Sequence, residues 1–289
     1  MSSDTRTLSA TTADGLRLAI DLYGEGTPVL LIHGLGFTRK KWQAQVECLV
    51  AAGCRVATFD LRGFGDSELP DDDYTIATLA QDTERVRLAV GFDTFHLVGH
   101  SLGGMVALQY AMENQDRVRS ICLASTSCHN GRRASALGHL LARISAVGFD
   151  AAMEDGQVQA ALEGLAGSVA KYVPTILEPL RKVTQEPDRA RSLAWRATAG
   201  FSVRWRLHEL TCPGVVMHGA SDMLMPFAAG IRLGEGLPNG RWLPVQGAGH
   251  NLPVRRPEIF NAALLELIES VRAPEGPDAD RTDAPDRPG

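Results

Sequence analysis

The chain has 289 residues, which is long enough for a large buried core and, for an α/β protein, short enough for a single domain. A hydrophobic share of 44 % and a charged share of 22 % indicate a soluble protein. A formal net charge of −5 argues against a nucleic-acid or anionic membrane partner, which leaves a small molecule. The five cysteines lack the spacing of a metal site, and no segment suits a signal peptide or membrane span, so we expect reduced thiols and a cytoplasmic location.

The first third of the chain alternates predicted strands and helices. Residues 7–23 predict an antiparallel hairpin at a sheet edge, because polar and apolar residues alternate around a turn signal. The apolar runs 29–32 and 55–60 predict buried strands with a helix between them that ends at Gly53. A second helix over 76–90 precedes the strand that ends at His100. This alternation predicts a parallel sheet.

The pattern changes after a further buried strand over 120–124. Residues 127–209 show no strand pattern and are rich in Ala, Leu and Arg at helical spacing, which predicts several short helices inserted as a lid. The sheet resumes with strands over 214–218 and 241–245, and a last amphipathic helix begins at Pro257.

We therefore predict an α/β fold with a mostly parallel eight-stranded sheet, helices on both faces and an inserted helical lid. Residues 1–126 and 210–272 form the two parts of the core in this prediction, and residues 127–209 form the lid. Residues 273–289 are rich in Pro, Asp and Arg, a composition that predicts a disordered tail.

A glycine-flanked serine lies where the strand ending at His100 gives way to an apolar helix. Gly99, Ser101 and Gly103 fit the pattern G-x-S-x-G, in which a sharp strand-to-helix turn exposes the serine hydroxyl above the sheet. The following residue, Leu102, begins the helix, so its N–H is an unpaired donor at the positive end of the helix dipole. Such a donor is suited to stabilise an oxyanion.

Two further residues suit this serine. A serine hydroxyl needs a base to take its proton, and a carboxylate to orient that base. Asp222 follows the strand that ends near residue 218, and His250 follows the last strand. Because ligand sites in open parallel sheets lie beyond the carboxyl ends of strands, we expect Ser101, Asp222 and His250 to meet there as nucleophile, acid and base.

Other residues complete the predicted site. The backbone N–H of Leu35, in a glycine-rich loop after the first parallel strand, is the predicted second donor of the oxyanion hole beside Leu102. Aromatic residues of the lid are candidates for substrate binding or for the lid's own core: Tyr172, Trp195, Phe201 and Trp205.

The chain resembles the α/β-hydrolase superfamily, in particular its lidded bacterial esterases, enol-lactone hydrolases and cofactor-free haloperoxidases. The resemblance covers residues 7–272 and rests on His33-Gly34-Leu35-Gly36, the segment 60–67 (DLRGFGDS), the serine turn, Gly219-Ala220-Ser221-Asp222 and Gly249-His250. The order Ser, Asp, His is also that of the family. Dehalogenases and epoxide hydrolases of this fold carry an aspartate as nucleophile, where this chain has Ser101.

The resemblance implies a serine hydrolase that cleaves an ester or lactone through an acyl-enzyme on Ser101, with no metal or organic cofactor. The same framework also serves C–C bond hydrolases, perhydrolases and cofactor-independent oxygenases, and non-catalytic ligand-binding proteins, so these stay as alternatives. The sequence specifies neither the acyl and leaving groups nor the oligomeric state.

Overall fold

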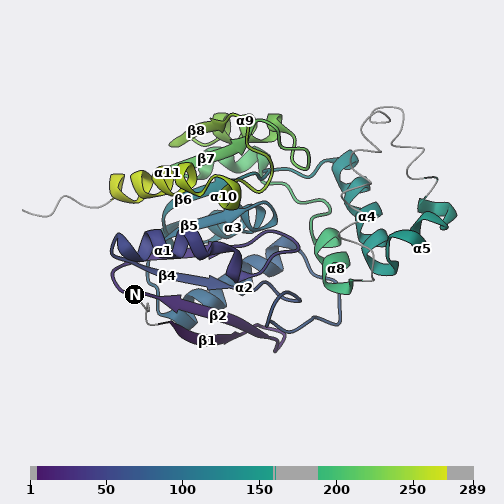
Figure 1. Ribbon diagram of the computed structural model, residues 1–289, viewed down its shortest axis with the longest axis horizontal. Coiled ribbons are helices and arrows are strands. Elements are labelled where there is room, and N and C mark those ends of the chain that lie inside the picture. Colours follow the sequence, from purple (N-terminus) through teal and green to yellow (C-terminus); the bar gives the residue numbers. More distant parts are fainter. Residues whose placement is uncertain (1–4, 159, 161–187, 272–289) are drawn as a thin grey trace, which may run out of the picture.

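The computed structural model describes residues 5–158, 160 and 188–271. Its centre is an eight-stranded sheet in the order β1-β2-β4-β3-β5-β6-β7-β8 (Figure 1). The predicted hairpin is confirmed, since β1 (Arg6–Thr11) and β2 (Arg17–Tyr23) pair antiparallel at one edge, and β2 pairs antiparallel with β4. All other pairs are parallel, and their strands are β3 (Thr27–Ile32), β4 (Cys54–Phe59), β5 (Phe95–His100), β6 (Val118–Ala124), β7 (Gly214–Gly219) and β8 (Gly240–Val245).

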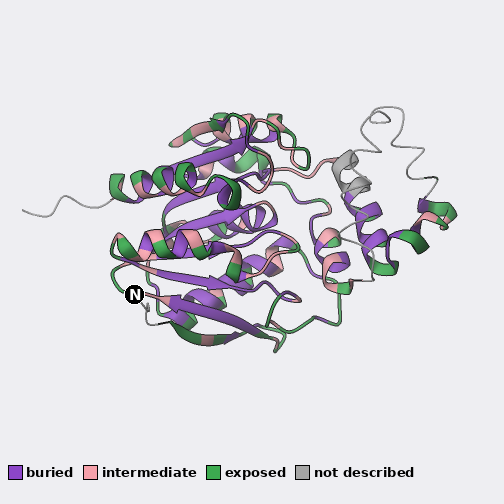
Figure 2. Cartoon of the chain, viewed as in Figure 1, coloured by how far each residue is buried: buried purple, intermediate pink, exposed green. Residues whose placement is uncertain are grey.

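Helices cover both faces of the sheet, as predicted. α1 (Gln43–Ala51) and α11 (Pro257–Ser270) pack with each other and share one apolar cluster on one face. α2 (Ile76–Val90), α3 (Leu102–Glu113) and α9 (Phe227–Gly236) contribute to a second cluster on the other face. The central strands are therefore buried on both sides (Figure 2), which explains why their sequences are nearly unbroken apolar runs.

Helix α2 begins and ends at local signals in the sequence. The Thr75 hydroxyl accepts a hydrogen bond from the Thr78 N–H at 3.2 Å, and the Thr78 hydroxyl accepts one from the Thr75 N–H, which together form a capping box. Gly91 ends the helix in a left-handed conformation with φ of 71°, which a residue with a side chain adopts at a cost.

Two helices were not predicted, α9 and the short α10 (Leu252–Arg255). α9 carries Gly230 and Gly234, and glycine lowers helix propensity by about 1 kcal/mol relative to alanine. The structure gives the reason for both glycines. A Cβ at either position would lie 2.6–2.8 Å from the Trp242 side chain of β8, so the helix needs glycine to approach the strand.

The described part of residues 127–209 is mainly helical. It contains α4 (Arg132–Val147), α5 (Phe149–Met153), α8 (Arg189–Ala197) and the 3₁₀ helix η4 (Arg204–Glu209). Its helices α4, α5 and α8 lie beyond one end of the sheet (Figure 1). An ion pair of 2.6 Å between Arg196 and Asp73 ties α8 to the loop after β4. Residues 161–187 of the predicted lid, with Tyr172, and the predicted tail 273–289 lie outside the described residues.

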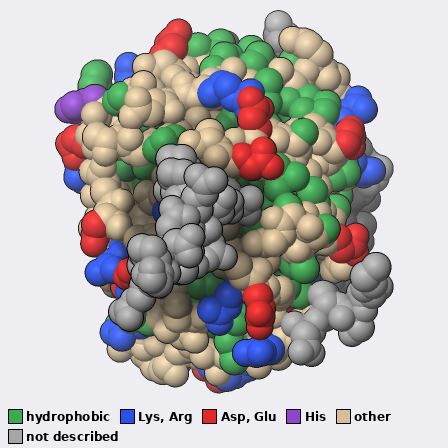
Figure 3. Space-filling model, turned by 90° about the vertical axis from the view of Figure 1, so that its left-hand side faces the viewer, with side chains coloured by type: hydrophobic (Ala, Val, Ile, Leu, Met, Phe, Trp, Pro, Cys, Tyr) green, Lys and Arg blue, Asp and Glu red, His purple; other side chains and the backbone are tan. Residues whose placement is uncertain are grey.

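Among the described helices, none is long and apolar enough to cross a membrane. The face opposite α4, α5 and α8, seen in Figure 3, carries basic and acidic side chains interspersed over its surface. All five cysteines have free thiols, and three of them are buried in the apolar clusters: Cys54, Cys122 and Cys128.

Candidate active site

The structure brings the three predicted residues Ser101, Asp222 and His250 into one hydrogen-bonded chain. Ser101 directly follows β5, Asp222 lies in the loop after β7, and His250 lies in the loop after β8. The Ser101 Oγ and His250 Nε2 are 3.0 Å apart. On the other side of the ring, His250 Nδ1 lies 2.9 Å and 3.1 Å from the two carboxylate oxygens of Asp222. Three parallel strands therefore end at one small site, as the sheet topology requires.

The turn at Ser101 has the strained geometry predicted from the two glycines. Ser101 has φ of 55° and ψ of −119°, one of only two positive φ values among the described non-glycine residues. A Cβ at Gly99 would lie 2.3 Å from the Gly103 carbonyl oxygen, and a Cβ at Gly103 would lie 2.3 Å from that of Ile32. Only glycine lets strand, turn and helix approach this closely.

Replacement of Gly103 by alanine is expected to destabilise the protein. The added methyl group meets the backbone of β3, which cannot move aside as a flexible side chain could. Overpacking of this kind lowers the free energy of unfolding by about 1–3 kcal/mol. Urea unfolding followed by circular dichroism measures the change. Gly156→Ala is the matched control, since nothing lies within 4 Å of its added methyl group; equal stability of both variants would contradict the role assigned to Gly103.

The hydrogen bonds fix the protonation pattern of the chain. A carboxylate only accepts, so His250 Nδ1 donates to Asp222 and Nε2 is free to accept from the Ser101 hydroxyl. Burial of Asp222 opposes its charge, but the hydrogen bond from His250 and the backbone N–H of Met225 outweigh burial and lower the pKa of Asp222. Asp222 Oδ1 also accepts from the Leu224 and Met225 N–H groups, both at 2.9 Å. The carboxylate is therefore ionised and rigidly placed.

The two predicted oxyanion donors lie beside the serine. Leu102 is the first residue of α3, so its N–H has no acceptor inside the helix. The Leu35 loop passes close to Ser101, because a Cβ at the preceding Gly34 would lie 3.1 Å from the Ser101 Cβ. This loop turns through Gly36, with φ of 77°, and the Phe37 N–H closes the turn on the Gly34 carbonyl at 3.2 Å.

The three described aromatic residues among the substrate-binding candidates lie in different environments. Phe201 is buried in the same apolar cluster as Leu102, and Trp195 is partly buried on α8. Trp205 is 76 % exposed and lies under the guanidinium of Arg204, 4.5 Å from the ring centroid, so it lines no enclosed cavity. The substrate-binding role of these residues stays a prediction.

Other histidines and acids in the family motifs have structural partners. Buried His33 accepts from the Leu61 N–H at 3.0 Å, and burial lowers its pKa to about 4. Asp60 is fully buried and accepts hydrogen bonds from both the backbone N–H and the guanidinium of Arg39. His33 and Asp60 therefore support the loops around the site.

Two residues in contact with the site were not predicted. The Thr126 hydroxyl donates to the Ser101 carbonyl at 2.7 Å. Lys41 Nζ lies 2.8 Å from Nδ1 of His100, the residue before Ser101. Neither residue belongs to a recognisable motif, and the adjacent Lys40 and Lys41 have the composition of a solvated turn, so the sequence carries no signal for the inward direction of Lys41.

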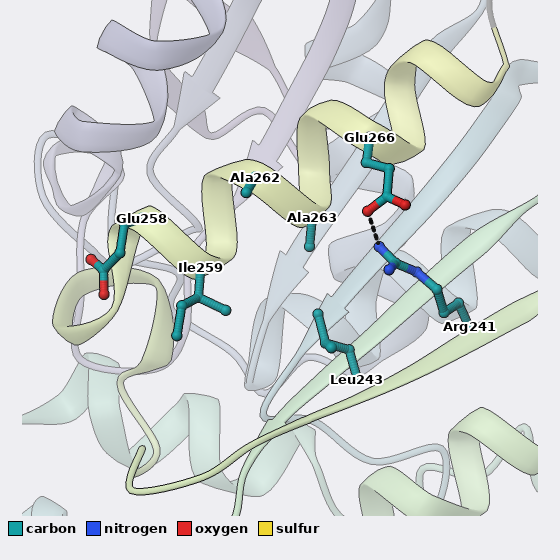
Figure 4. Close-up of a pocket in the computed structure, with 7 residues that line it drawn as sticks. All are labelled: Arg241, Leu243, Glu258, Ile259, Ala262, Ala263 and Glu266. Carbon is teal, nitrogen blue, oxygen red and sulfur yellow. Dashed lines mark hydrogen bonds and ion pairs between the residues drawn. The ribbon is translucent and has the colours of Figure 1, made fainter.

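A separate, open surface pocket of about 400 Å³ lies on the opposite side of β8 from α9, between β8 and α11 (Figure 4). An ion pair of 2.9 Å between Arg241 and Glu266 crosses it. None of its lining residues belongs to the Ser101 chain: Arg241, Leu243, Glu258, Ile259, Ala262, Ala263 and Glu266.

A family model described as the alpha/beta hydrolase fold matches residues 27–171. The chain therefore belongs to the α/β-hydrolase fold family, as its resemblance implied. Over 268 residues it is 33 % identical to a protein of Variovorax paradoxus named "Putative carbamate hydrolase RutD", a match that covers 88 % of this chain and 96 % of the relative. It is 29 % identical to a proline iminopeptidase of Lactobacillus delbrueckii over 86 % of this chain and 91 % of that protein.

Among solved structures, the chain is similar to a thermophilic esterase from Thermogutta terrifontis. The TM-score is 0.73 at 26 % sequence identity, and the match covers 94 % of this chain and all of the esterase chain.

Proposed function

We propose that this protein is a serine hydrolase that cleaves a carboxylic ester or lactone of a small organic molecule through an acyl-enzyme on Ser101. The observation that carries the proposal is the hydrogen-bonded chain from Ser101 Oγ through His250 to Asp222, at 3.0 Å and 2.9 Å. An imidazole that accepts from a hydroxyl and donates to a buried carboxylate has the arrangement needed to activate a nucleophile.

The reaction proceeds in two steps. In the first, His250 Nε2 takes the hydroxyl proton while Ser101 Oγ bonds to the substrate carbonyl carbon, and the Leu35 and Leu102 N–H groups stabilise the resulting oxyanion. His250 then gives the proton to the leaving oxygen as the bond to it breaks. In the second step, water loses a proton to His250 and attacks the acyl-enzyme carbonyl. The bond from that carbon to Ser101 Oγ then breaks, His250 returns the proton to Oγ, and the acid is released.

A carbamate is the second candidate substrate. The relative with 33 % identity carries this activity in its name, and a carbamate presents the same kind of carbonyl to the serine as an ester does. The two candidates differ in the group transferred to Ser101, carbamoyl or acyl, and not in the roles of Ser101, Asp222 and His250. A side-by-side comparison of substrates therefore decides between them.

The test combines labelling with a substrate panel. A fluorophosphonate probe is expected to label the wild type at Ser101, as located by peptide mass spectrometry. p-Nitrophenyl esters of graded chain length, lactones and aryl carbamates then rank the substrate classes by kcat/KM. An unlabelled protein that consumes oxygen with a candidate substrate and hydrolyses none would favour the oxygenase alternative. One that neither labels nor turns over any substrate would favour ligand binding.

A further inference from the structure

His100 connects three segments around the site. Its side chain is fully buried at the end of β5, and its Nε2 lies 2.9 Å from the main-chain carbonyl oxygen of His250. Its Nδ1 lies 2.8 Å from Lys41 Nζ, on the 3₁₀ helix η1 (Arg39–Trp42). A Cβ at Gly34 would lie 2.8 Å from the same Nδ1. The ring centroids of His100 and His250 are 5.1 Å apart.

These contacts select one tautomer of His100. A carbonyl oxygen only accepts, so Nε2 carries a proton and donates it to the His250 carbonyl. Nδ1 of the neutral ring is then an acceptor, and Lys41 supplies the donor. Burial, together with the positive charge of Lys41, holds the pKa of His100 well below its usual range, so the ring stays neutral. Without Lys41, the ring could place its proton on Nδ1 and turn a lone pair toward the His250 carbonyl.

Lys41 is held by apolar and aromatic neighbours. Its Nζ lies 4.3 Å from the ring centroid of Phe37 and 4.9 Å from that of Trp42. Within the described residues, no carboxylate lies within ion-pair distance of it. Burial lowers the pKa of Lys41 to about 7, so the amine is charged at acid pH and largely neutral above pH 8.

The titratable groups that face this pair are imidazoles. His33, at the end of β3, and His250 both act electrostatically on His100, as Lys41 does. Lys40, the neighbour of Lys41 on η1, is exposed, and Arg39 on the same helix is paired with Asp60.

We propose that Lys41 and His100 are positioning residues that hold the main chain of His250 and fix the direction of its imidazole toward Ser101. The proposal deepens the proposed function and rests on it. Loss of Lys41 is therefore expected to free the tautomer of His100 and to loosen the orientation of His250.

Lys41→Met tests the proposal on the full chain with the best ester of the panel. The variant is expected to lose about tenfold in kcat with little change in KM, because the base is misplaced and not the substrate. Lys40→Met is the matched control, because it removes the same charge from an exposed neighbour.

Two variants of His100 separate the two hydrogen bonds. His100→Gln can still donate to the His250 carbonyl and has no tautomer to fix, whereas His100→Asn can accept from Lys41 but is too short to reach His250. The glutamine variant is expected to have about tenfold higher kcat than the asparagine variant. In the His100→Gln background, Lys41→Met is expected to cost no further kcat. Circular dichroism and urea unfolding report whether each variant is folded.

The outcomes distinguish this proposal from the proposed function. If the wild type is labelled and active, and Lys41→Met keeps the kcat and KM of Lys40→Met, the pair has no positioning role although the proposed serine hydrolase function stands. The positioning role of Lys41 and His100 is also overturned if the two His100 variants lose kcat equally. An additive loss of kcat in the double variant Lys41→Met/His100→Gln would overturn it as well. If the wild type is neither labelled nor active, both proposals fail.

Discussion

Ser101→Ala is expected to lower kcat by about a million-fold, which leaves only the slow reaction supported by substrate binding and the proposed oxyanion donors, the Leu35 and Leu102 N–H groups. In a serine protease with the same three groups, loss of the nucleophile costs about this much. The alanine variant keeps the strained turn and removes only the oxygen that lies 3.0 Å from His250 Nε2. Single-turnover and steady-state assays with a p-nitrophenyl ester measure the loss, and the fluorophosphonate probe is expected to leave the variant unlabelled.

Ser221→Ala is the matched control for this experiment. Ser221 lies on the exposed surface of the loop that carries Asp222, so the same oxygen is removed near the site but outside the hydrogen-bonded chain. The control is expected to retain wild-type kcat. Retention of even a tenth of wild-type activity by Ser101→Ala would show that Ser101 is not the nucleophile.

Asp222→Asn is expected to lower kcat by about ten-thousand-fold. An asparagine can keep the hydrogen bonds from the Leu224 and Met225 N–H groups, so the loop retains its shape. Its amide group, however, donates toward His250 Nδ1, which forces the imidazole proton onto Nε2. The base then faces Ser101 with a donor in place of an acceptor.

The pH profile checks the assignment of Asp222. Because the pKa of Asp222 is lowered in the folded protein, its carboxylate stays ionised as the pH falls to the usual range of aspartate, and it is not expected to contribute an acid limb near neutrality. Asp72→Asn, on an exposed loop, is the matched control. A loss of less than tenfold in Asp222→Asn would point to another partner for His250.

The elements that carry the site could be predicted because each has a strong local cause. A strand buried on both faces needs a mostly apolar sequence, as β3 and β5 have, and a tight strand-to-helix turn needs the glycines at 99 and 103. Parallel strands then place their following loops at one edge, so the approach of Ser101, Asp222 and His250 follows from topology.

The features that were not predicted depend on packing between distant residues. α9 has low helix propensity because Trp242 requires glycine at 230 and 234, a requirement visible only once β8 lies against the helix. Lys40 and Lys41 are equivalent in the sequence, and only the rotation of η1 turns one toward solvent and the other toward His100. Trp205 differs from Lys41 in the opposite direction. An aromatic residue is expected to be buried, but the structure exposes Trp205 to solvent.

The backbone of Ser101 has a consequence for evolution and for engineering. A residue with a side chain in such a sparsely populated conformation costs the folded state about 1–3 kcal/mol, and glycine would be spared most of it. At position 101, the residue that gives the higher thermal stability is therefore not the residue that catalysis requires. A selection for thermal stability alone would favour Ser101→Gly, which removes the nucleophile. Selection for stable variants therefore has to include a measurement of activity.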